Sequence, residues 1–397
     1  MKPRVVIIVP TYNERENIYP LVRALAKVFR AVTTYECILL VVDDQSPDGT
    51  AKEVIAQSHK YTWIKLLKNK HKLGLGHAYK VSMRYALDKL GADIIFEFDA
   101  DLSHDPNMIP PFLKKIELGA DIVLGTRYVR GGGIPRDWPW YRKFLSVVGN
   151  MFIKIVMINF RITDWTTGYR ALRREVVENI LPQLRESIFN GYTWQIGSLF
   201  KSLELGYKVE EVPFYFIDRT RGQSKMGLEY FLNTLMYVLK SRIKQIVHSR
   251  FLKFALIGGM GALIQLVALH IYRRILLIPG VWVLSEYQVS LLLAIETSIV
   301  SNFIWNNFWT FRDRKLKALQ IPGKFIQFNL TSGGSILIQF FIASAGEHLI
   351  GLFNIFETAV AGRSISLDTG AVYAIVGILV GMFWNFFAYT HIIWKKK

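Results

Sequence analysis

Asp93-Ile-Ile-Phe-Glu-Phe-Asp-Ala-Asp-Leu-Ser-His-Asp-Pro106 joins an apolar run directly to a cluster of carboxylates. The apolar half predicts a buried strand, and Asp99 and Asp101 follow it, spaced by one residue. Alternation along an extended chain would point both carboxylates the same way, which would let them share one hard cation, Mg²⁺ or Mn²⁺. A helix N-cap with a spare acid before Pro106 is the structural alternative.

This stretch belongs to an alternating pattern that covers the first part of the chain. The strand-like segments are residues 5–9, 36–42, 63–67 and 93–98, and the helix-like segments between them are residues 17–29, 50–58 and 76–90. Such alternation predicts an α/β domain with a mainly parallel sheet covered by helices. Ligands of such domains bind at the carboxyl ends of the strands, so the loops that follow the strands are the informative ones.

Two further loops place polar groups directly after a predicted strand. Asp43 and Asp44 follow the second strand, where a carboxylate can accept hydrogen bonds from a ribose or a base. Asp48 lies in a Pro-Asp-Gly turn, which indicates a structural role. The first loop offers the aromatic face of Tyr12 and the carboxylate of Glu14 to a nucleobase.

The second part of the chain is apolar enough to be membrane-embedded. Four stretches with almost no charge cover residues 254–272, 289–311, 325–346 and 370–394. Each is near the ~20 residues that a helix needs to cross ~30 Å of hydrocarbon. Core helices of a large soluble domain would have polar outer faces, which these segments lack. We therefore predict an all-α domain of four transmembrane helices.

The distribution of charge predicts the topology. Of the net charge of +18, much lies in basic clusters before the first span, between spans two and three, and at Lys395–Lys397. Four spans place these clusters on one side, which the positive-inside rule assigns to the cytoplasm, with Arg273 and Arg274 as a minor exception. The N-terminal α/β half and both termini are then expected to be cytoplasmic. Because the excess charge flanks the membrane, it suits lipid head groups and phosphorylated ligands, and no nucleic-acid partner is expected.

The membrane half also repeats itself. Gly258-Gly259 recurs as Gly333-Gly334, and Phe303-Ile-Trp-Asn306 recurs as Met382-Phe-Trp-Asn385, which predicts two copies of one helical hairpin. Glu296 lies inside the second span, where an ionisable group is costly and indicates function. A pair with Asn302, Asn306 or a polar group of another span is the structural alternative.

Taken together, the motifs of residues 1 to about 230 resemble those of dolichol-phosphate mannose synthases, which are inverting family-2 glycosyltransferases with the Rossmann-like GT-A fold. The shared motifs are Pro10-Thr-Tyr-Asn-Glu14, Val42-Asp43-Asp44, Asp99-Ala-Asp101, Gly125-Thr-Arg-Tyr128, Thr167-Gly-Tyr-Arg170 and Arg221-Gly-Gln-Ser-Lys225. Trp138-Pro139, Arg142 and Ser146 strengthen the likeness to mannose synthases. The C-terminal half resembles the GtrA-like membrane domain that accompanies such enzymes.

The resemblance implies a role for each matched residue. The guanosine of GDP-mannose would be held by Pro10, Tyr12, Glu14, Val42 and Asp44. Asp99, Ala100 and Asp101 would complete the donor site, with Mg²⁺ or Mn²⁺ on the two carboxylates. Ser103 stands where some relatives have glutamine, so its hydroxyl is a weaker or water-mediated metal ligand.

The expected acceptor, a dolichyl or polyprenyl phosphate, is already an oxyanion near neutral pH and needs no general base. Cations are needed instead, and the candidates that would orient the phosphates are Arg127, Arg142, Arg221 and Lys225. The structural alternative for each of these four residues is a solvated surface cation without a ligand. His77 and His104 are expected to be structural.

These expectations give three domains: a GT-A domain at residues 1–230, an interface helix at 231–252 and a GtrA-like membrane domain at 253–397. Residues 138–160 and 230–251 alternate aromatic and basic side chains, which suits a helix in the head-group layer or an amphipathic helix packed on the sheet. The expected reaction is inverting transfer of mannose from GDP-mannose to the lipid phosphate. A UDP-glucose-dependent enzyme and a lipid-linked sugar translocase remain as alternatives.

Overall fold

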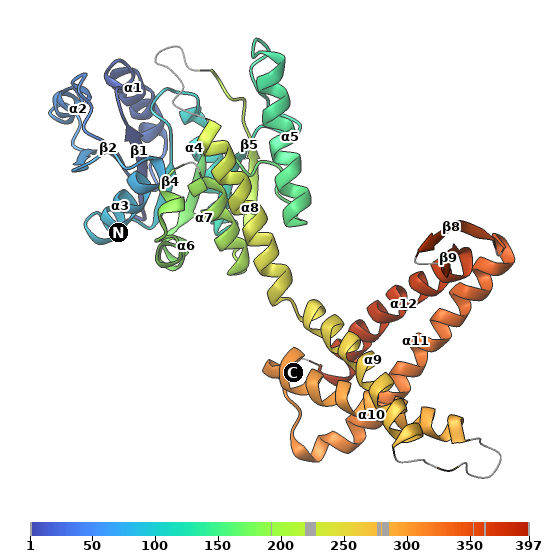
Figure 1. The fold of residues 1–397 in the computed structure, drawn as a ribbon. Coiled ribbons are helices and arrows are strands. Elements are labelled where there is room, and N and C mark those ends of the chain that lie inside the picture. Colours follow the sequence, from blue (N-terminus) through green and yellow to red (C-terminus); the bar gives the residue numbers. More distant parts are fainter. Residues whose placement is uncertain are drawn as a thin grey trace. The chain divides into compact units, whose positions relative to one another are not determined.

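The computed structural model describes residues 2–191, 193–218, 228–275, 279, 286–351, 353–360 and 363–395. It divides into two compact units, Met1–Arg242 and Ile243–Lys397, and each is described by itself (Figure 1).

A seven-stranded sheet forms the centre of the N-terminal unit. Its strands are β1 (Arg4–Thr11), β2 (Glu36–Asp43), β3 (Ile64–Lys68), β4 (Ile94–Glu97), β5 (Ile122–Thr126), β6 (Arg170–Arg173) and β7 (Val209–Pro213), in the order β3-β2-β1-β4-β6-β5-β7. Neighbours are parallel except at β6, which is antiparallel to both β4 and β5. The predicted mainly parallel α/β fold is confirmed, and β1 to β4 overlap the four predicted strands.

Helices cover both faces of this sheet. They are α1 (Arg15–Ala31), α2 (Thr50–Ser58), α3 (Leu75–Asp88), α4 (Ile109–Glu117), α5 (Trp140–Met157), α6 (Arg174–Ile180), α7 (Thr193–Glu204) and α8 (Leu228–His248), with short 3-10 turns η1 (Pro106–Met108), η2 (Leu181–Gln183) and η3 (Ser187–Asn190). Alternate residues of β1 enter two cores: Val6 and Ile8 pack with α3, α6 and α7, whereas Val5, Ile7 and Val9 pack with α1 and α4. The sheet is buried on both faces, as parallel sheets are.

The strand register brings the three predicted loops to one edge of the sheet. β1 lies between β2 and β4, and Thr11 pairs with Asp43 at the end of the first ladder. On the other side, Ile8 pairs with Glu97, and the Phe98 N–H donates to the Ile8 carbonyl at 3.1 Å. Because all three strands run in the same direction, their carboxyl ends open onto the same surface.

The C-terminal unit is built on four long helices: α9 (Arg250–Arg274), α10 (Glu286–Trp305), α11 (Ile321–Leu349) and α12 (Thr369–Ala388). Four segments, Arg250–Arg274, Val289–Thr310, Ala318–Leu349 and Ile375–Ile393, are long and apolar enough to cross a membrane, which confirms the four predicted spans. Short turns η5 (Arg312–Arg314) and η6 (Ala318–Gln320) precede α11. A two-stranded hairpin of β8 (Asn354–Val360) and β9 (Arg363–Asp368) follows α11 and was not predicted.

The helices pair as two hairpins, α9 with α10 and α11 with α12. In each, a small residue admits the partner helix: a Cβ on Gly261 would meet the Asn302 amide, and a Cβ on Gly381 would meet Ser335. The last turns of α10 and α12 continue as π-helical segments, η4 (Asn306–Thr310) and η7 (Tyr389–Ile393).

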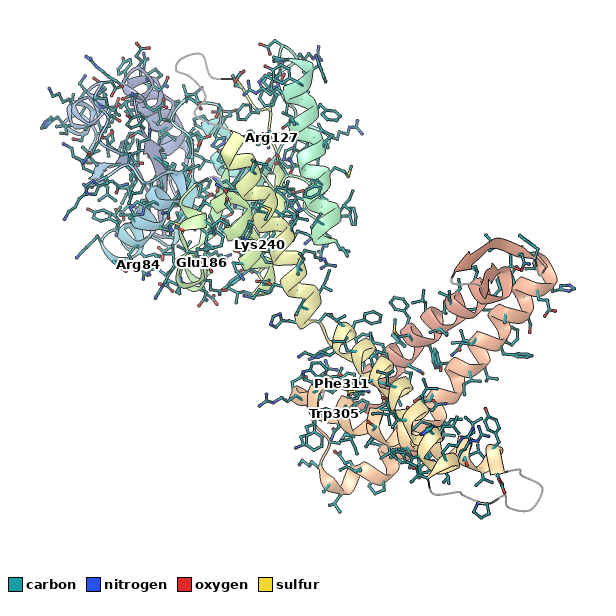
Figure 2. All side chains as sticks on the ribbon, in the orientation of Figure 1. Arg84, Arg127, Glu186, Lys240, Trp305 and Phe311 are labelled. Carbon is teal, nitrogen blue, oxygen red and sulfur yellow. The ribbon has the colours of Figure 1, made fainter. Side chains whose placement is uncertain are left out.

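The ends of these two π-helical segments join the hairpins. The rings of Phe311 and Trp394 stack at 4.6 Å, and the Trp394 indole donates to Asn307 Oδ1 at 3.1 Å. Figure 2 shows Phe311 among the side chains of this junction. Aromatic residues of α9, α10, α11 and η7 complete the cluster: Phe254, Phe303, Phe328 and Tyr389.

Glu296 does not form the pair with Asn302 or Asn306 that was the structural alternative. It is exposed on α10, whereas Asn302 faces Gly261 and Asn306 Nδ2 donates to the Asn302 carbonyl at 2.8 Å. Helical geometry explains the difference, because positions 296 and 302 are six residues, or about 240°, apart around the helix axis. Neither asparagine is therefore the partner of Glu296.

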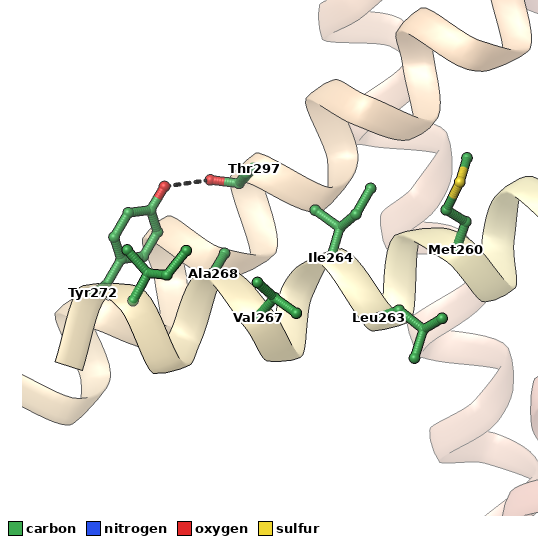
Figure 3. Close-up of a pocket in the computed structure, with 8 residues that line it drawn as sticks. Met260, Leu263, Ile264, Val267, Ala268, Tyr272 and Thr297 are labelled. Carbon is green, nitrogen blue, oxygen red and sulfur yellow. Dashed lines mark hydrogen bonds between the residues drawn. The ribbon is translucent and has the colours of Figure 1, made fainter. Parts of the chain in front are cut away.

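An apolar groove also runs along the first hairpin, on the surface of α9. It is lined by Met260, Leu263, Ile264, Val267, Ala268, Ile271, Tyr272 and Thr297, and the Tyr272 and Thr297 hydroxyls share a hydrogen bond of 2.8 Å at one end (Figure 3). These side chains suit contact with lipid chains.

Candidate active site at the carboxyl edge of the sheet

Each of the three loops at the carboxyl edge turns through a residue with left-handed backbone conformation. These residues are Asn13 (φ 59°), Gln45 (φ 60°) and Leu102 (φ 61°), and only Ile158 shares this feature among the described non-glycine residues. Left-handed conformation is costly for residues other than glycine and concentrates at functional sites. The three sharp turns therefore mark this edge as the candidate site.

The first two loops are interlocked by hydrogen bonds. The Asp44 N–H donates to the Thr11 carbonyl at 3.0 Å, and the Asn13 N–H donates to Ser46 Oγ at 3.0 Å. Asp48 accepts from the Arg15 N–H at 3.0 Å, so it contributes to this scaffold. Tyr12 and Glu14, predicted to hold a nucleobase, are thereby carried on a loop whose position is set by the next strand.

Asp44 is a buried carboxylate at the end of β2. It is 7% exposed, and its Oδ1 accepts from Asn69 Nδ2 at 2.6 Å. Burial raises the pKa of Asp44, while the Asn69 hydrogen bond and the charges of His77 and Lys72 oppose the rise. Neighbouring Asp43 accepts from the Ser46 N–H at 3.2 Å and holds the loop itself. Asp44 is thus the acid of this loop that is poised to receive a ligand's hydrogen bonds.

Asp99 and Asp101 lie on a turn rather than on an extended chain. β4 ends at Glu97, the chain turns at Ala100 and Asp101, and Leu102 is left-handed. The alternation argument for a shared direction therefore does not apply. The turn is held instead by the Ser103 N–H, which donates to Asp101 Oδ1 at 3.0 Å.

His104 supports this turn from below. The Asp99 N–H donates to its Nδ1 at 3.1 Å, which leaves the ring proton on Nε2, 3.5 Å from Asp99 Oδ2. Burial lowers the pKa of His104 far below that of a free histidine, so the ring is neutral at pH 7. The ring stacks on Tyr169 at 4.8 Å, and Tyr169 stacks on Phe112 at 4.5 Å.

The Thr167-Gly-Tyr-Arg170 motif is explained by this packing. A Cβ on Gly168 would lie 3.2 Å from the Gln195 amide and 3.6 Å from His104, which explains the absence of a side chain there. Arg170 is buried and donates to the carbonyls of Thr167 (2.9 Å) and Gln195 (2.5 Å), and Glu97 is its partner at 3.9 Å. The motif therefore ties β6 and α7 to the turn that carries Asp99.

Arg127 lies inside the N-terminal unit in a closed ion pair (Figure 2). Its Nε and Nη2 donate to the Asp164 carboxylate at 2.7 and 2.8 Å, and Nη2 also donates to Thr166 at 2.9 Å. The two side chains are 10% and 0% exposed, and the Asp164 carboxylate raises the pKa of Arg127 against the effect of burial. The donors of Arg127 are thus largely engaged within the protein.

Arg142 lies in a more open environment on α5. Its guanidinium stacks on Trp138 at 3.7 Å, and Nη1 donates to Asp218 at 2.9 Å. The Trp138 indole donates to the same carboxylate at 2.9 Å. The Arg142 and Asp218 side chains are 38% and 32% exposed. Arg221 and Lys225 lie outside the described residues.

The donor atoms at the turn suit a small hard cation. Asp99 and Asp101 supply carboxylates, and Ser103 Oγ is a buried oxygen with no hydrogen-bond partner among the residues that the structure describes. The described ranges, this turn included, hold no group of three or more His, Cys, Asp or Glu side chains placed to bind a metal, so the turn offers two carboxylates and one hydroxyl. Mg²⁺ and Mn²⁺ are often held by one or two carboxylates together with phosphate oxygens and water, so these residues fit such an ion.

Several residues of the site escaped the sequence analysis. Three of them are hydrogen-bond partners of predicted residues: Asn69 of Asp44, Asp164 of Arg127 and Asp218 of Arg142. The partners lie 25, 37 and 76 residues apart in the chain. Asp164 stands three residues before the Thr-Gly-Tyr-Arg motif, which is the one local signal that could have drawn attention to it. The other two carry no such signal.

Comparisons with known proteins agree with this architecture. Residues 6–181 match the model of the family described as "Glycosyl transferase family 2", and residues 253–394 match the model of the family described as "GtrA/DPMS, transmembrane domain". A dolichol-phosphate mannosyltransferase of Pyrococcus furiosus is 32% identical over 340 residues, which cover 85% of this chain and 89% of that protein. An undecaprenyl-phosphate mannosyltransferase of Micrococcus luteus is 39% identical over 224 residues, or 56% of this chain and 88% of that protein.

A solved structure, that of glucosyl-3-phosphoglycerate synthase from Mycobacterium tuberculosis, is also similar. It gives a TM-score of 0.45 at 18% identity, and the match covers 60% of this chain and 80% of that one.

Proposed function

We propose, from the premise that the chain belongs to the dolichol-phosphate mannosyltransferases of glycosyltransferase family 2, that it transfers mannose from GDP-mannose to a polyprenyl phosphate. The observation that supports this most is the convergence of three acid-bearing loops at one edge of the sheet. The chain is an integral membrane protein, and its relatives act on lipid phosphates by name.

The donor nucleotide would lie across the loops after β1 and β2. Tyr12 offers a ring face to the base, and Glu14 and Asp44 offer carboxylates to its N–H groups or to the ribose. Pro10 and Val42 are the last apolar residues before these loops and would line the base from the strand side. The burial of Asp44 strengthens a hydrogen bond to it, because water competes less there.

The diphosphate would lie over the turn after β4. Asp99, Asp101 and the Ser103 hydroxyl would hold Mg²⁺ or Mn²⁺, with Ala100 beneath the ligand. The bound ion would neutralise charge that develops on the departing GDP. His104 contributes indirectly, since its Nδ1 accepts the Asp99 N–H at 3.1 Å and so fixes the backbone that carries this carboxylate.

The acceptor phosphate needs orientation rather than deprotonation. One of its oxygens attacks the anomeric carbon while the bond from that carbon to the diphosphate breaks, so that GDP leaves and the configuration inverts. Of the two described candidate arginines, Arg142 is the more exposed, and this phosphate could replace Asp218 on its guanidinium. Arg127 would act through the loop that it holds with Asp164, and Arg221 and Lys225 remain candidates from the sequence.

The long apolar chain of the acceptor requires the site to lie near a bilayer surface. On α5 only Asn150, Ile153 and Met157 are buried, while a broad apolar face is exposed. This supports the head-group-layer interpretation of residues 138–160. By contrast, α8 buries Tyr237 against Phe189 at 5.1 Å, so part of it packs on the sheet domain. The basic clusters support a cytoplasmic position of the site.

The proposal is tested by incubating the purified protein with radiolabelled GDP-mannose or UDP-glucose, Mn²⁺ and a polyprenyl phosphate. Labelled lipid from GDP-mannose alone is expected. Labelled lipid from UDP-glucose alone would overturn the assignment of GDP-mannose as the donor. The absence of labelled lipid with either donor would overturn the proposed enzymatic function. Chromatography of the released sugar phosphate on anomer standards checks inversion.

A further inference from the structure

A lysine covers the aromatic ring that is proposed to receive the nucleobase. Lys72 Nζ lies 3.4 Å from the centroid of the Tyr12 ring, which is a close cation–π contact. The lysine comes from the connection between β3 and α3, whereas Tyr12 belongs to the loop after β1. The contact therefore closes over the site from a different part of the chain.

This contact excludes a base from the same face of the ring. Stacked carbon atoms approach to ~3.5–4.0 Å, which is the space that the ammonium group now occupies. A base that stacks there must displace Lys72. The contact itself is weak, because Lys72 is exposed and a cation that stays in contact with water gains little from an aromatic ring over its hydration. Displacement is therefore inexpensive for a ligand that brings a replacement partner.

The connection that carries Lys72 is fixed at both ends and exposed in the middle. At its start, buried Asn69 donates to Asp44 at 2.6 Å. At its end, Gly74 has φ 98°, and a Cβ there would lie 2.5 Å from the Asn190 carbonyl. Lys70, His71 and Lys72 between these anchors are exposed. The lysine can thus move while its two anchors keep the connection over the site.

The charge of Lys72 already acts on the donor site, because it opposes the rise in the pKa of Asp44. A nucleoside diphosphate bound at Tyr12 and Asp44 would bring two or more negative charges into this neighbourhood. A lysine suits the exchange, since its ammonium is a compact charge on a flexible stem that can leave one partner and reach another.

We propose that Lys72 covers Tyr12 in the free protein, is displaced by the incoming base and then pairs with the diphosphate of the bound nucleotide. The inference rests on the proposed function, because it takes the Tyr12 loop as the base site. It assigns Lys72 two opposing effects. The lysine competes with the base and favours the phosphates, so it selects a nucleoside diphosphate over a nucleoside.

The test compares guanosine with GDP, using the full-length protein in nanodiscs and isothermal titration calorimetry. Lys72→Met keeps the length of the side chain and removes its charge. We expect the affinity for guanosine to rise or stay unchanged and the affinity for GDP to fall about tenfold, the size of a charge-assisted contact. Lys70→Met removes an equal charge from the same connection and is expected to change neither constant by more than about twofold.

Two outcomes would overturn the inference. Equal weakening of guanosine and GDP in Lys72→Met would indicate a structural role of the connection. An equal loss of GDP affinity in Lys70→Met would indicate a general charge effect rather than a specific contact. If the native protein prefers uridine nucleotides, the same comparison is made with uridine and UDP. Failure of the native protein to bind any of these nucleotides would instead overturn the proposed function.

Discussion

Arg127 and Arg142 are both arginines of the N-terminal unit that pair with an aspartate, yet their surroundings differ. The Arg127–Asp164 pair is 10% and 0% exposed and is bidentate, with a further bond to Thr166. The Arg142–Asp218 pair is 38% and 32% exposed, and the Arg142 guanidinium also lies over the Trp138 ring at 3.7 Å. The first pair is closed to solvent, and the second is open to it.

From this difference we expect the closed pair to belong to the scaffold and the open pair to belong to the proposed ligand site. A buried bidentate pair is costly to break, because either partner alone would be left charged in a dry environment. An exposed pair exchanges easily, since water and another anion can replace the carboxylate. The pair of Arg170 and Glu97 is likewise closed to solvent. The turn that carries Asp99 and Asp101 is open to it, since the Asp99 side chain is 42% exposed. Four predictions test whether this division holds.

The largest effect is expected at the open turn. Asp101→Asn keeps an oxygen for the Ser103 N–H but removes the negative charge of the carboxylate. Turnover should fall about a thousandfold, the size of several kcal/mol of lost transition-state stabilisation. The measurement is initial rate with saturating donor and metal, alongside the melting temperature. Asp105→Asn, four residues away, is the control, and an Asp101 variant with native turnover would remove the metal proposal.

The next effect concerns the closed pair and appears in stability. Asp164→Ala leaves Arg127 charged and buried, which should lower the free energy of unfolding of the N-terminal unit by about 3–5 kcal/mol. Asp218→Ala removes the partner of an exposed arginine and should cost less than about 1 kcal/mol. Urea denaturation followed by tryptophan fluorescence measures both. Similar losses in the two variants would contradict the division into closed and open pairs.

A third prediction sharpens the role of the open pair. Arg142→Gln should raise the KM for polyprenyl phosphate about tenfold, with little change in the KM for GDP-mannose. Asp218→Asn should lower the KM for polyprenyl phosphate. The variant removes the carboxylate that competes for Arg142 and keeps an acceptor for the Trp138 indole. A rise in the KM for the acceptor in both variants would indicate that the pair works only as an intact unit.

The smallest effect is a pH dependence at Asp44. Its pKa is raised by burial, so the carboxylate becomes protonated at a higher pH than an ordinary aspartate and loses its capacity as an ionised acceptor. Donor affinity should therefore fall a few-fold as the pH drops through this raised pKa. The contribution of Asp44 to folding stability has the opposite pH dependence. Because its pKa is raised in the folded state, protonation of Asp44 stabilises the fold at low pH, and this stabilisation is lost as the pH rises.

Calorimetric titration of GDP across the pH range measures the first of these effects. Asp44→Asn is the matched control, since it cannot ionise and should flatten the profile. An unchanged profile in that variant would assign the pH dependence to another group.

The sequence alone determined the elements and the chemistry of the loops. Continuous apolar runs and amphipathic segments predicted β1 to β4 and α1 to α3, because these patterns are local and a sheet that is buried on both faces requires apolar strands. Long uncharged segments predicted the four spans for the same reason. The acids after β2 and β4 were visible because strand ends are recognisable in one dimension.

Tertiary structure decided which charges remain open to a ligand. No local pattern distinguishes Arg127 from Arg142, since Asp164 and Asp218 reach them from 37 and 76 residues away. Nor could the sequence place antiparallel β6 between β4 and β5, bring Lys72 onto Tyr12, or turn Glu296 away from Asn302. Each of these outcomes depends on contacts that form only after distant segments pack, and local sequence patterns do not encode those contacts.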